Sequence, residues 1–186
     1  MSSKPAPPTE FAATEAVLTQ ALADYKAALE ADGLPAPHLT DAKPTVFDDR
    51  NFVPSPALGQ VTLTLVSSLN KMTHLVQSSI ERYRLLSLWH WHNRAIVLME
   101  QQKIADFLAE AGEKGMSVSE LGPKVNVHPE RLLTLLRLLA NDDIFVEVKE
   151  GVFANNRTSL AITTDFACRT SITHLWVGAQ RVASSL

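Results

Sequence analysis

Residues 117–154 read SVSELGPKVNVHPERLLTLLRLLANDDIFVEVKEGVFA, and this stretch is the part of the sequence that predicts the fold most clearly. Ser117 and Glu120 have the spacing of a capping box, which predicts a short helix directly after the serine. Pro129 suits the first position of a second helix, because its fixed backbone angle is helical and its missing N–H is not needed there. That helix is rich in leucine and is expected to end at residues 141–143.

Two short strands are expected after the leucine-rich helix. Residues 144–148 alternate between apolar and polar side chains, and residues 152–154 repeat the pattern after the tight turn at 149–151. Two helices followed by a two-stranded β-wing describe a winged helix-turn-helix. The sequence therefore predicts a mainly α-helical protein with a small wing.

Two long helices are predicted upstream of the wing. From Ala57 to about residue 84, apolar residues recur every three or four positions. Their arc is wide, so this helix needs cover on more than one side. A further helix is expected over residues 85–110, and it contains the aromatic run Trp89-His90-Trp91-His92 (residues 89–92).

Residues 1–56 read as a proline-rich N-terminal arm, since eight of the ten prolines fall here. Thr9 is a plausible N-cap for a helix over residues 9–32, and Gly33 is its expected stop. The remaining residues, 34–56, predict an extended strap that lies across the body of the protein or across a second subunit.

The C-terminal residues 159–186 carry another amphipathic pattern. One predicted face holds Ile172, Leu175, Trp176, Ala179 and Val182. The expected division of the chain is an arm at 1–56, a helical and winged-helix domain at 57–160, and a C-terminal helix at 161–186.

Composition and charge exclude several classes of protein. The 186 residues carry a net charge of −3, with a pI near 6.1, which disfavours a strongly cationic binder of nucleic acid or membranes. The single cysteine, Cys168, cannot form an intramolecular disulfide. The N-terminus lacks the apolar run of a signal peptide, and no stretch offers the roughly 20 apolar residues of a membrane span. A cytoplasmic protein is expected.

The sequence contains none of the usual motifs of bond-making chemistry. No two of its seven glycines form Gly-x-Gly, and neither a nucleophile elbow nor His-Glu-x-x-His occurs. His90 and His92 are two positions apart and so point to opposite sides of a helix, whereas zinc-binding pairs are four apart. The aromatic run is better explained as anchors at a packing or subunit interface. We therefore predict no catalytic, cofactor-binding or metal-binding residue.

A winged helix also raises the possibility of DNA recognition. Between Ile96 and Leu160, however, seven Lys and Arg residues are outnumbered by ten Asp and Glu, and the wing tip is acidic. Phosphate contacts supply much of the affinity for DNA, and these acids would oppose them. A nucleic-acid partner is therefore not expected.

Several segments together carry a resemblance to a known family. They are Ile104–Leu108 (IADFL), 117–121 (SVSEL), 127–140 (VHPERLLTLLRLLA), 144–148 (IFVEV) and 151–159 (GVFANNRTS). This combination resembles the N-terminal winged-helix dimerisation domain of the S-adenosylmethionine-dependent O-methyltransferases, especially those of fungal type. The resemblance is most specific from about residue 96 to 160.

The resemblance implies a function that does not involve DNA. In that family the winged helix packs against a second copy and helps to close the substrate pocket of a separate Rossmann-type domain. S-adenosylmethionine is expected only in that catalytic domain, and the residues after Leu160 are too few to form it. The chain would be either part of an O-methyltransferase or a short, non-catalytic relative that acts as a partner or regulator. Its expected partner is a second copy or a full-length relative.

The dimer interface is expected on the long helices, because their apolar faces would otherwise leave large patches exposed. The candidate interface residues are Phe11, Leu18, Leu22, Tyr25, Leu65, Leu69, Met72, Val76, Trp89, Trp91 and Trp176.

Overall fold

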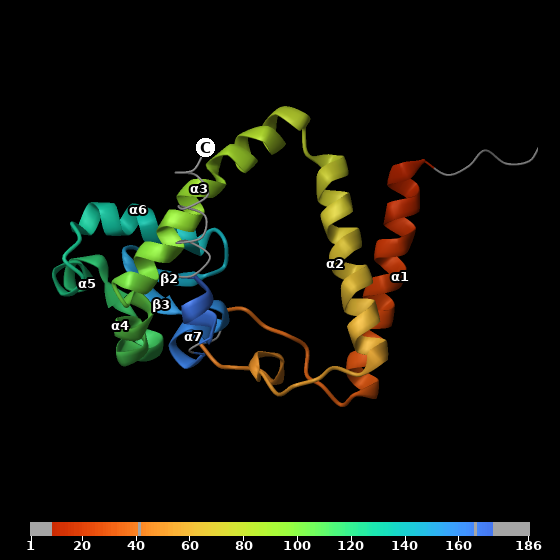
Figure 1. Ribbon diagram of the computed structural model, residues 1–186, viewed down its shortest axis with the longest axis horizontal. Coiled ribbons are helices and arrows are strands. Elements are labelled where there is room, and N and C mark those ends of the chain that lie inside the picture. Colours follow the sequence, from red (N-terminus) through yellow and green to blue (C-terminus); the bar gives the residue numbers. More distant parts are fainter. Residues whose placement is uncertain (1–8, 41, 166, 173–186) are drawn as a thin grey trace, which may run out of the picture. The chain divides into compact units, whose positions relative to one another are not determined.

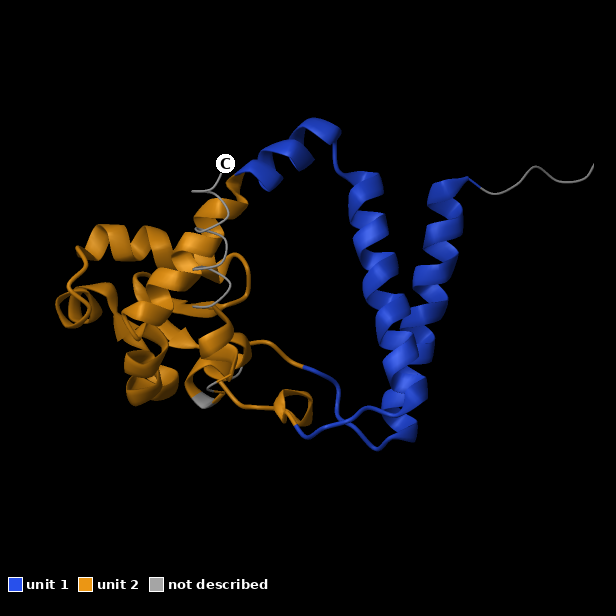
Figure 2. Ribbon diagram, viewed as in Figure 1, with its two compact units in different colours: residues 1–37, 51–87 blue, residues 38–50, 88–186 orange. Residues whose placement is uncertain are grey.

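The computed structural model describes residues 9–40, 42–165 and 167–172, which fall into two compact units (Figures 1 and 2). Unit 1 holds the described residues up to 37 together with 51–87. Unit 2 holds those from 38 to 50 and from 88 onward. Most of the described residues are helical, and a small antiparallel sheet lies in unit 2.

Unit 1 is built on two helices that lie side by side, α1 (Glu10–Ala31) and α2 (Pro56–Val76) (Figure 1). The predicted cap is present, since the Thr9 hydroxyl accepts a hydrogen bond from the Ala12 N–H at 3.2 Å. Ser55 caps α2 in the same way. The pair buries little, and its buried side chains are those of Ala21, Leu29, Leu58 and Ser68.

The predicted long helix from Ala57 to residue 84 is wrong at its end. The first helix stops at Val76, because Gln77 is extended and the Ser78 hydroxyl accepts the Glu81 N–H at 3.1 Å. A new helix, α3 (Ser79–Gln101), begins there. The apolar periodicity continues through residues 77 and 78, so it does not indicate that one helix ends there and that Ser78 caps the next.

The predicted helix over residues 85–110 is likewise divided. Lys103 adopts a left-handed backbone with φ of 53°, which ends α3 and starts α4 (Ile104–Ala111). A lysine with a left-handed backbone is uncommon, and the residue type gives no means of predicting that conformation.

Unit 2 contains residues 117–154, for which the sequence predicts a winged helix-turn-helix. Its elements after α4 are η2 (Gly112–Lys114), β1 (Met116–Ser117), α5 (Val118–Lys124), α6 (Pro129–Ala140), β2 (Phe145–Lys149), β3 (Val152–Asn155) and α7 (Arg157–Thr164). The capping box of Ser117 and Glu120 is present, and Pro129 opens α6. The core is formed by side chains that are completely buried, namely Leu108, Leu121, Leu132, Leu136, Leu139 and Phe153.

The sheet has three strands in the order β1-β3-β2, all antiparallel, so the predicted two-stranded wing is incomplete. The additional strand pairs Met116 with Phe153. Gly115 makes this possible, because its φ is +68° and an added Cβ would lie 2.4 Å from the Phe153 carbonyl oxygen. Only glycine allows the backbone to approach so closely.

The predicted continuous helix from residue 159 is also wrong. Helix α7 ends at Thr164, and the extended Asp165 accepts hydrogen bonds from the N–H groups of Ala167 and Cys168. Residues 167–172 are again helical. Trp176 and the rest of 173–186 lie outside the described residues. None of the helices in the described part of the chain combines the length and apolarity that a bilayer crossing needs.

Candidate functional site

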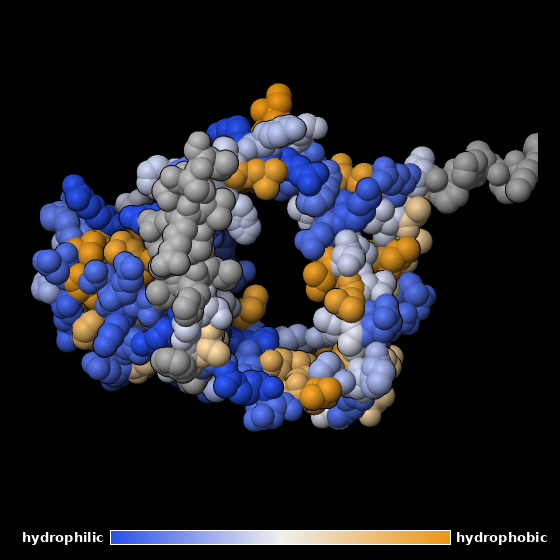
Figure 3. Space-filling model, viewed as in Figure 1, coloured by the Kyte–Doolittle hydropathy of each residue, from blue (hydrophilic) through white to orange (hydrophobic). Residues whose placement is uncertain are grey.

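Unit 1 leaves many large apolar side chains in contact with solvent. Ile80 and Tyr83 at the start of α3 are 76% and 77% exposed, and Leu63 and Val76 of α2 are 66% and 65% exposed. We use the name α2–α3 apolar surface for Leu63, Val66, Leu69, Val76, Ile80, Tyr83 and Leu86. Figure 3 shows apolar side chains gathered on the helices of this unit. Exposed apolar surface on this scale is typical of a site that another protein covers.

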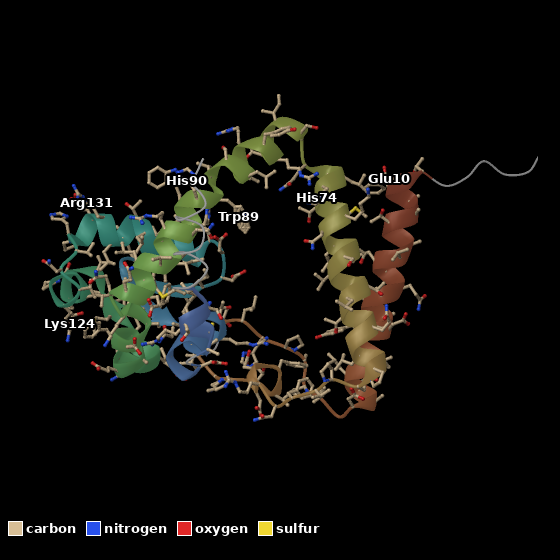
Figure 4. All side chains as sticks on the ribbon, in the orientation of Figure 1. Glu10, His74, Trp89, His90, Lys124 and Arg131 are labelled. Carbon is tan, nitrogen blue, oxygen red and sulfur yellow. The ribbon has the colours of Figure 1, made fainter. Side chains whose placement is uncertain are left out.

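A groove of about 510 Å³ runs between α1 and α2. Small and hydroxyl side chains, among them Ala13, Thr64 and Ser67, line much of it together with Leu63. An ion pair of Glu10 with Lys71 also belongs to its lining, and Glu10 lies at the start of α1 (Figure 4). This lining is shallow and mostly apolar, and it offers no cluster of reactive groups.

A second hollow, of about 360 Å³, lies at the bend between α2 and α3. It is lined by His74, Gln77, Ser79, Arg82, Tyr83 and Leu86. The bend therefore places two members of the α2–α3 apolar surface beside polar side chains, an arrangement found at the rims of protein interfaces.

In unit 2 the aromatic run lies on the exposed side of α3. Trp89 and Trp91 are 55% and 58% exposed, and Trp89 and His90 leave the helix on different sides (Figure 4). His92 is engaged locally, with Nε2 at 3.1 Å from an Asp142 carboxylate oxygen. Among the described residues, no three His, Cys, Asp or Glu side chains gather as a metal site would require. The two tryptophans thus present apolar surface to solvent.

Trp91 also borders a groove of about 330 Å³ between α3 and α6. Leu98, Leu135 and Leu138 contribute apolar lining, and Arg131 contributes charge.

Burial, followed by the nearby Asp165 carboxylate, raises the pKa of the Cys168 thiol, so this cysteine is not an activated nucleophile.

The predicted interface residues are divided by the structure into two groups. Six are exposed, namely Phe11, Leu22, Leu69, Val76, Trp89 and Trp91, while Leu18, Tyr25, Leu65 and Met72 are half-buried. The predicted list lacked the two most exposed members of the α2–α3 apolar surface, Ile80 and Tyr83. The sequence prediction places both in the apolar stripe of one long helix, whereas the structure places them in α3.

A charged pair fixes the sheet to α6. Arg137 donates to both carboxylate oxygens of Glu147, at 2.7–3.3 Å, and the Gly151 N–H donates to the same carboxylate at 2.8 Å. The hydrogen bonds from Arg137, then that from Gly151, lower the pKa of Glu147. Of the two arginines of α6, Arg137 is therefore already paired with a carboxylate of the same chain.

A second charged cluster holds part of the predicted strap against unit 2. We call residues 38–40 and 42–50 the strap; it contains the short helix η1 (Val46–Asp48). Arg157 Nε lies 2.9 Å and 3.1 Å from the two carboxylate oxygens of Asp48, and the Arg157 N–H donates to the Leu39 carbonyl at 3.1 Å. Of the two positions predicted for residues 34–56, this part lies across the body of its own chain.

We expect the free energy of unfolding to fall in acid, because carboxyl groups in unit 2 have lowered pKa values. Burial would raise the pKa of Asp48, but hydrogen bonds from Arg157 and Thr45 outweigh it, and backbone N–H groups lower that of Asp165. A carboxyl with a lowered folded-state pKa stabilises the protein above its unfolded pKa, about 4, and this contribution disappears as pH falls through the folded value. Denaturant titrations at pH 7, 5, 4 and 3 should show a loss that begins below about pH 4.5. Equal stability at pH 7 and pH 3 would contradict it.

Comparison with known proteins finds relatives that are similar in sequence to this chain. No family model matches the chain. It is 32% identical over 116 residues to the O-methyltransferase cicE of Emericella nidulans, a match that covers 62% of this chain and 22% of that enzyme. The O-methyltransferase tpcA of Aspergillus fumigatus is 27% identical over 113 residues, covering 61% of this chain and 23% of the enzyme.

A third relative matches nearly the whole chain. The O-methyltransferase gliM of Aspergillus fumigatus is 28% identical over 177 residues, which cover 95% of this chain and 39% of that enzyme. The chain thus spans only 22% to 39% of the length of these relatives. This mainly helical chain with a small antiparallel sheet is thus similar in sequence to part of several fungal O-methyltransferases. The matches are consistent with an N-terminal domain of fungal O-methyltransferases.

Proposed function

We propose that this chain is the dimerisation and substrate-pocket-closing part of an O-methyltransferase-like protein and does not transfer methyl groups by itself. The observation that carries the proposal is the α2–α3 apolar surface, above all Ile80 and Tyr83, of which more than three quarters is exposed. Burying a large apolar side chain contributes about 1.5–3 kcal/mol, so a second copy that covers several of them gains considerable affinity.

Two further features support association through helices. Trp89 and Trp91 follow Tyr83 along the same helix, α3, and tryptophan is among the residues most enriched in the centres of protein interfaces. The helices α1 and α2 bury few side chains between them. A helix pair with so small a core gains stability when a partner covers its remaining apolar faces.

The winged helix-turn-helix forms part of this proposal. The order α5, α6, β2, β3 and the pairing of β2 with β3 are compatible with it. DNA binding is the less favoured reading, because Arg137 is engaged by Glu147 and the acids between residues 96 and 160 outnumber the basic residues.

The methyl donor S-adenosylmethionine is expected to bind elsewhere than on these residues. Dinucleotide-type sites use a parallel strand, a glycine-rich turn and a helix N-terminus. In the part of the chain that the structure describes, the sheet is antiparallel. Its positive-φ glycines lie after α1 and α4, beside β1 and in the hairpin turn, namely Gly33, Gly112, Gly115 and Gly151. These residues do not fit the cofactor, so no step of methyl transfer is derived from them.

Calorimetric titration of S-adenosylmethionine into the purified chain tests the non-catalytic part of the proposal. We expect no heat beyond that of dilution, because the described residues form no site for the adenosine or the methionine moiety. A full-length O-methyltransferase, titrated under the same conditions, serves as the positive control. Binding of the cofactor to this chain at micromolar Kd would show that the proposal is wrong.

A further inference from the structure

Several polar contacts between the strap and the rest of unit 2 converge on Arg157, and an exposed ion pair also joins Lys43 to Glu113 at 3.9 Å. Besides Asp48, the Arg157 guanidinium contacts the His38 carbonyl, to which Nη1 donates at 3.3 Å, and its Cζ lies 5.8 Å from the centre of the Phe47 ring. The side chains of Arg157 and Asp48 are only 18% and 22% exposed. Arg157 thus reaches the strap near both of its ends.

A second attachment lies further along the strap. Arg50 Nη2 is 2.8 Å from an Asp165 carboxylate oxygen, and the same oxygen accepts the N–H groups of Ala167 and Cys168. Two hydrogen bonds within the strap orient Asp48 toward Arg157. Its carboxylate accepts the N–H and the hydroxyl of Thr45, at 2.6 Å and 2.8 Å. Local hydrogen bonds therefore hold both carboxylates in position, Asp48 in the strap and Asp165 after α7.

The core cluster of unit 2 does not hold the strap, although Phe47 is half-buried beside the Arg157 guanidinium. The core cluster of unit 2, with the partly buried side chains packed against it, includes no strap residue among those described, and Leu39 and Val46 are exposed. A segment held by polar contacts over a preformed core can separate without unfolding that core. Such contacts also weaken with acid and with salt.

We propose that the strap is a latch, which Arg157 closes and which opens as a unit while the sheet and α6 stay folded. The closed latch divides the connection between α1 and α2 into two short linkers, residues 32–37 and 51–55, each able to span at most about 20 Å. The open latch leaves one linker from residue 32 to 55. The length of chain that tethers the C-terminal end of α1 to unit 2 thus depends on Arg157, whereas α2 stays joined to unit 2 through α3.

The latch has a consequence that rests on the proposed function. Shorter linkers restrict the positions from which the helices α1 and α2 can present their apolar side chains to a second copy. Opening the latch would then change the affinity or geometry of association. The opening itself does not depend on any partner and is measured without one.

Hydrogen–deuterium exchange of the whole chain tests the latch. In Arg157→Ala, we expect peptides that cover 42–50 to exchange at least tenfold faster, because the η1 amides and the Thr45 N–H lose the arrangement that protects them. Peptides of α6 and β3 should keep their wild-type rates. Arg137→Ala is the matched control: it removes an equally well-bonded arginine from unit 2 and should leave the strap unchanged.

A second set of variants separates a latch from general damage. Asp48→Ala should open the strap as Arg157→Ala does, and the double variant should add little, because both changes remove the same pair. Unchanged exchange of the strap in Arg157→Ala would overturn the latch. Equal acceleration in the strap, α6 and β3 would also overturn it, because the strap would then be part of the cooperative fold. Either result leaves the proposed dimerisation untouched, since that is measured by mass.

Discussion

The double variant Ile80→Asp/Tyr83→Asp is expected to raise the Kd of self-association by at least about 100-fold. Each side chain contributes roughly 1.5–3 kcal/mol when it is buried, and 100-fold corresponds to about 2.8 kcal/mol, so the loss of two is sufficient. The burial of two unpaired carboxylates would oppose association further. Both side chains are mostly exposed within the chain, so the fold itself should be retained. Sedimentation velocity over a concentration series gives the Kd, and circular dichroism checks the helix content.

Val53→Asp is the matched control for this variant. Val53 is 83% exposed, more than Ile80 or Tyr83, but it lies in the linker before α2 and outside the α2–α3 apolar surface. It should therefore keep the wild-type Kd. If the control weakens association as strongly as the double variant does, added negative charge is responsible and the surface is not the interface.

The largest expected effect on stability comes from Phe153→Ala. This side chain of β3 is completely buried in the core of unit 2. Its truncation removes apolar contacts and leaves a cavity, which costs about 3–5 kcal/mol of the free energy of unfolding. Denaturant titration followed by circular dichroism measures the change.

The control for this prediction is Val148→Ala in the neighbouring strand β2. Val148 is 44% exposed, so its truncation should change the free energy of unfolding by no more than about 0.5–1 kcal/mol. A loss below about 1 kcal/mol for Phe153→Ala would mean that the sheet does not contribute to the core of unit 2. In that case the structural account of this unit would be incorrect.

The parts of the fold that could be predicted from sequence are those with local signals. The capping box at Ser117 and Glu120, the proline that opens α6 and the Thr9 cap of α1 each involve residues a few positions apart. Their hydrogen bonds form within one turn of helix, so the residue types alone identify them. The hairpin of β2 and β3 was predictable for the same reason.

The features that were missed depend on contacts between distant residues or on polar details inside an apolar pattern. Strand β1 exists because Gly115 lets the chain approach Phe153, 38 positions later. The bend between α2 and α3 depends on the Ser78 hydroxyl, which an uninterrupted apolar stripe conceals. Arg157 and Asp48 are far apart in sequence, and no local pattern indicates that they pair.

The sequence predicted exposed apolar side chains on the long helices, but it identified only some of the residues concerned. Helical periodicity identified apolar stripes on the long helices, and six of the predicted interface residues are exposed in the structure; whether a partner covers them stays a prediction. It could not separate side chains covered by a neighbouring helix, such as Leu18 and Met72, from those left in solvent. That difference depends on how α1 packs against α2, which the sequence pattern of one helix does not show.

The most direct test of the central claim is the mass of the purified chain in solution. Sedimentation equilibrium at micromolar concentrations should give twice the 20.4 kDa of one chain, because we propose that a second copy covers the α2–α3 apolar surface. A single species of 20.4 kDa that stays monomeric throughout the concentration range would contradict the account.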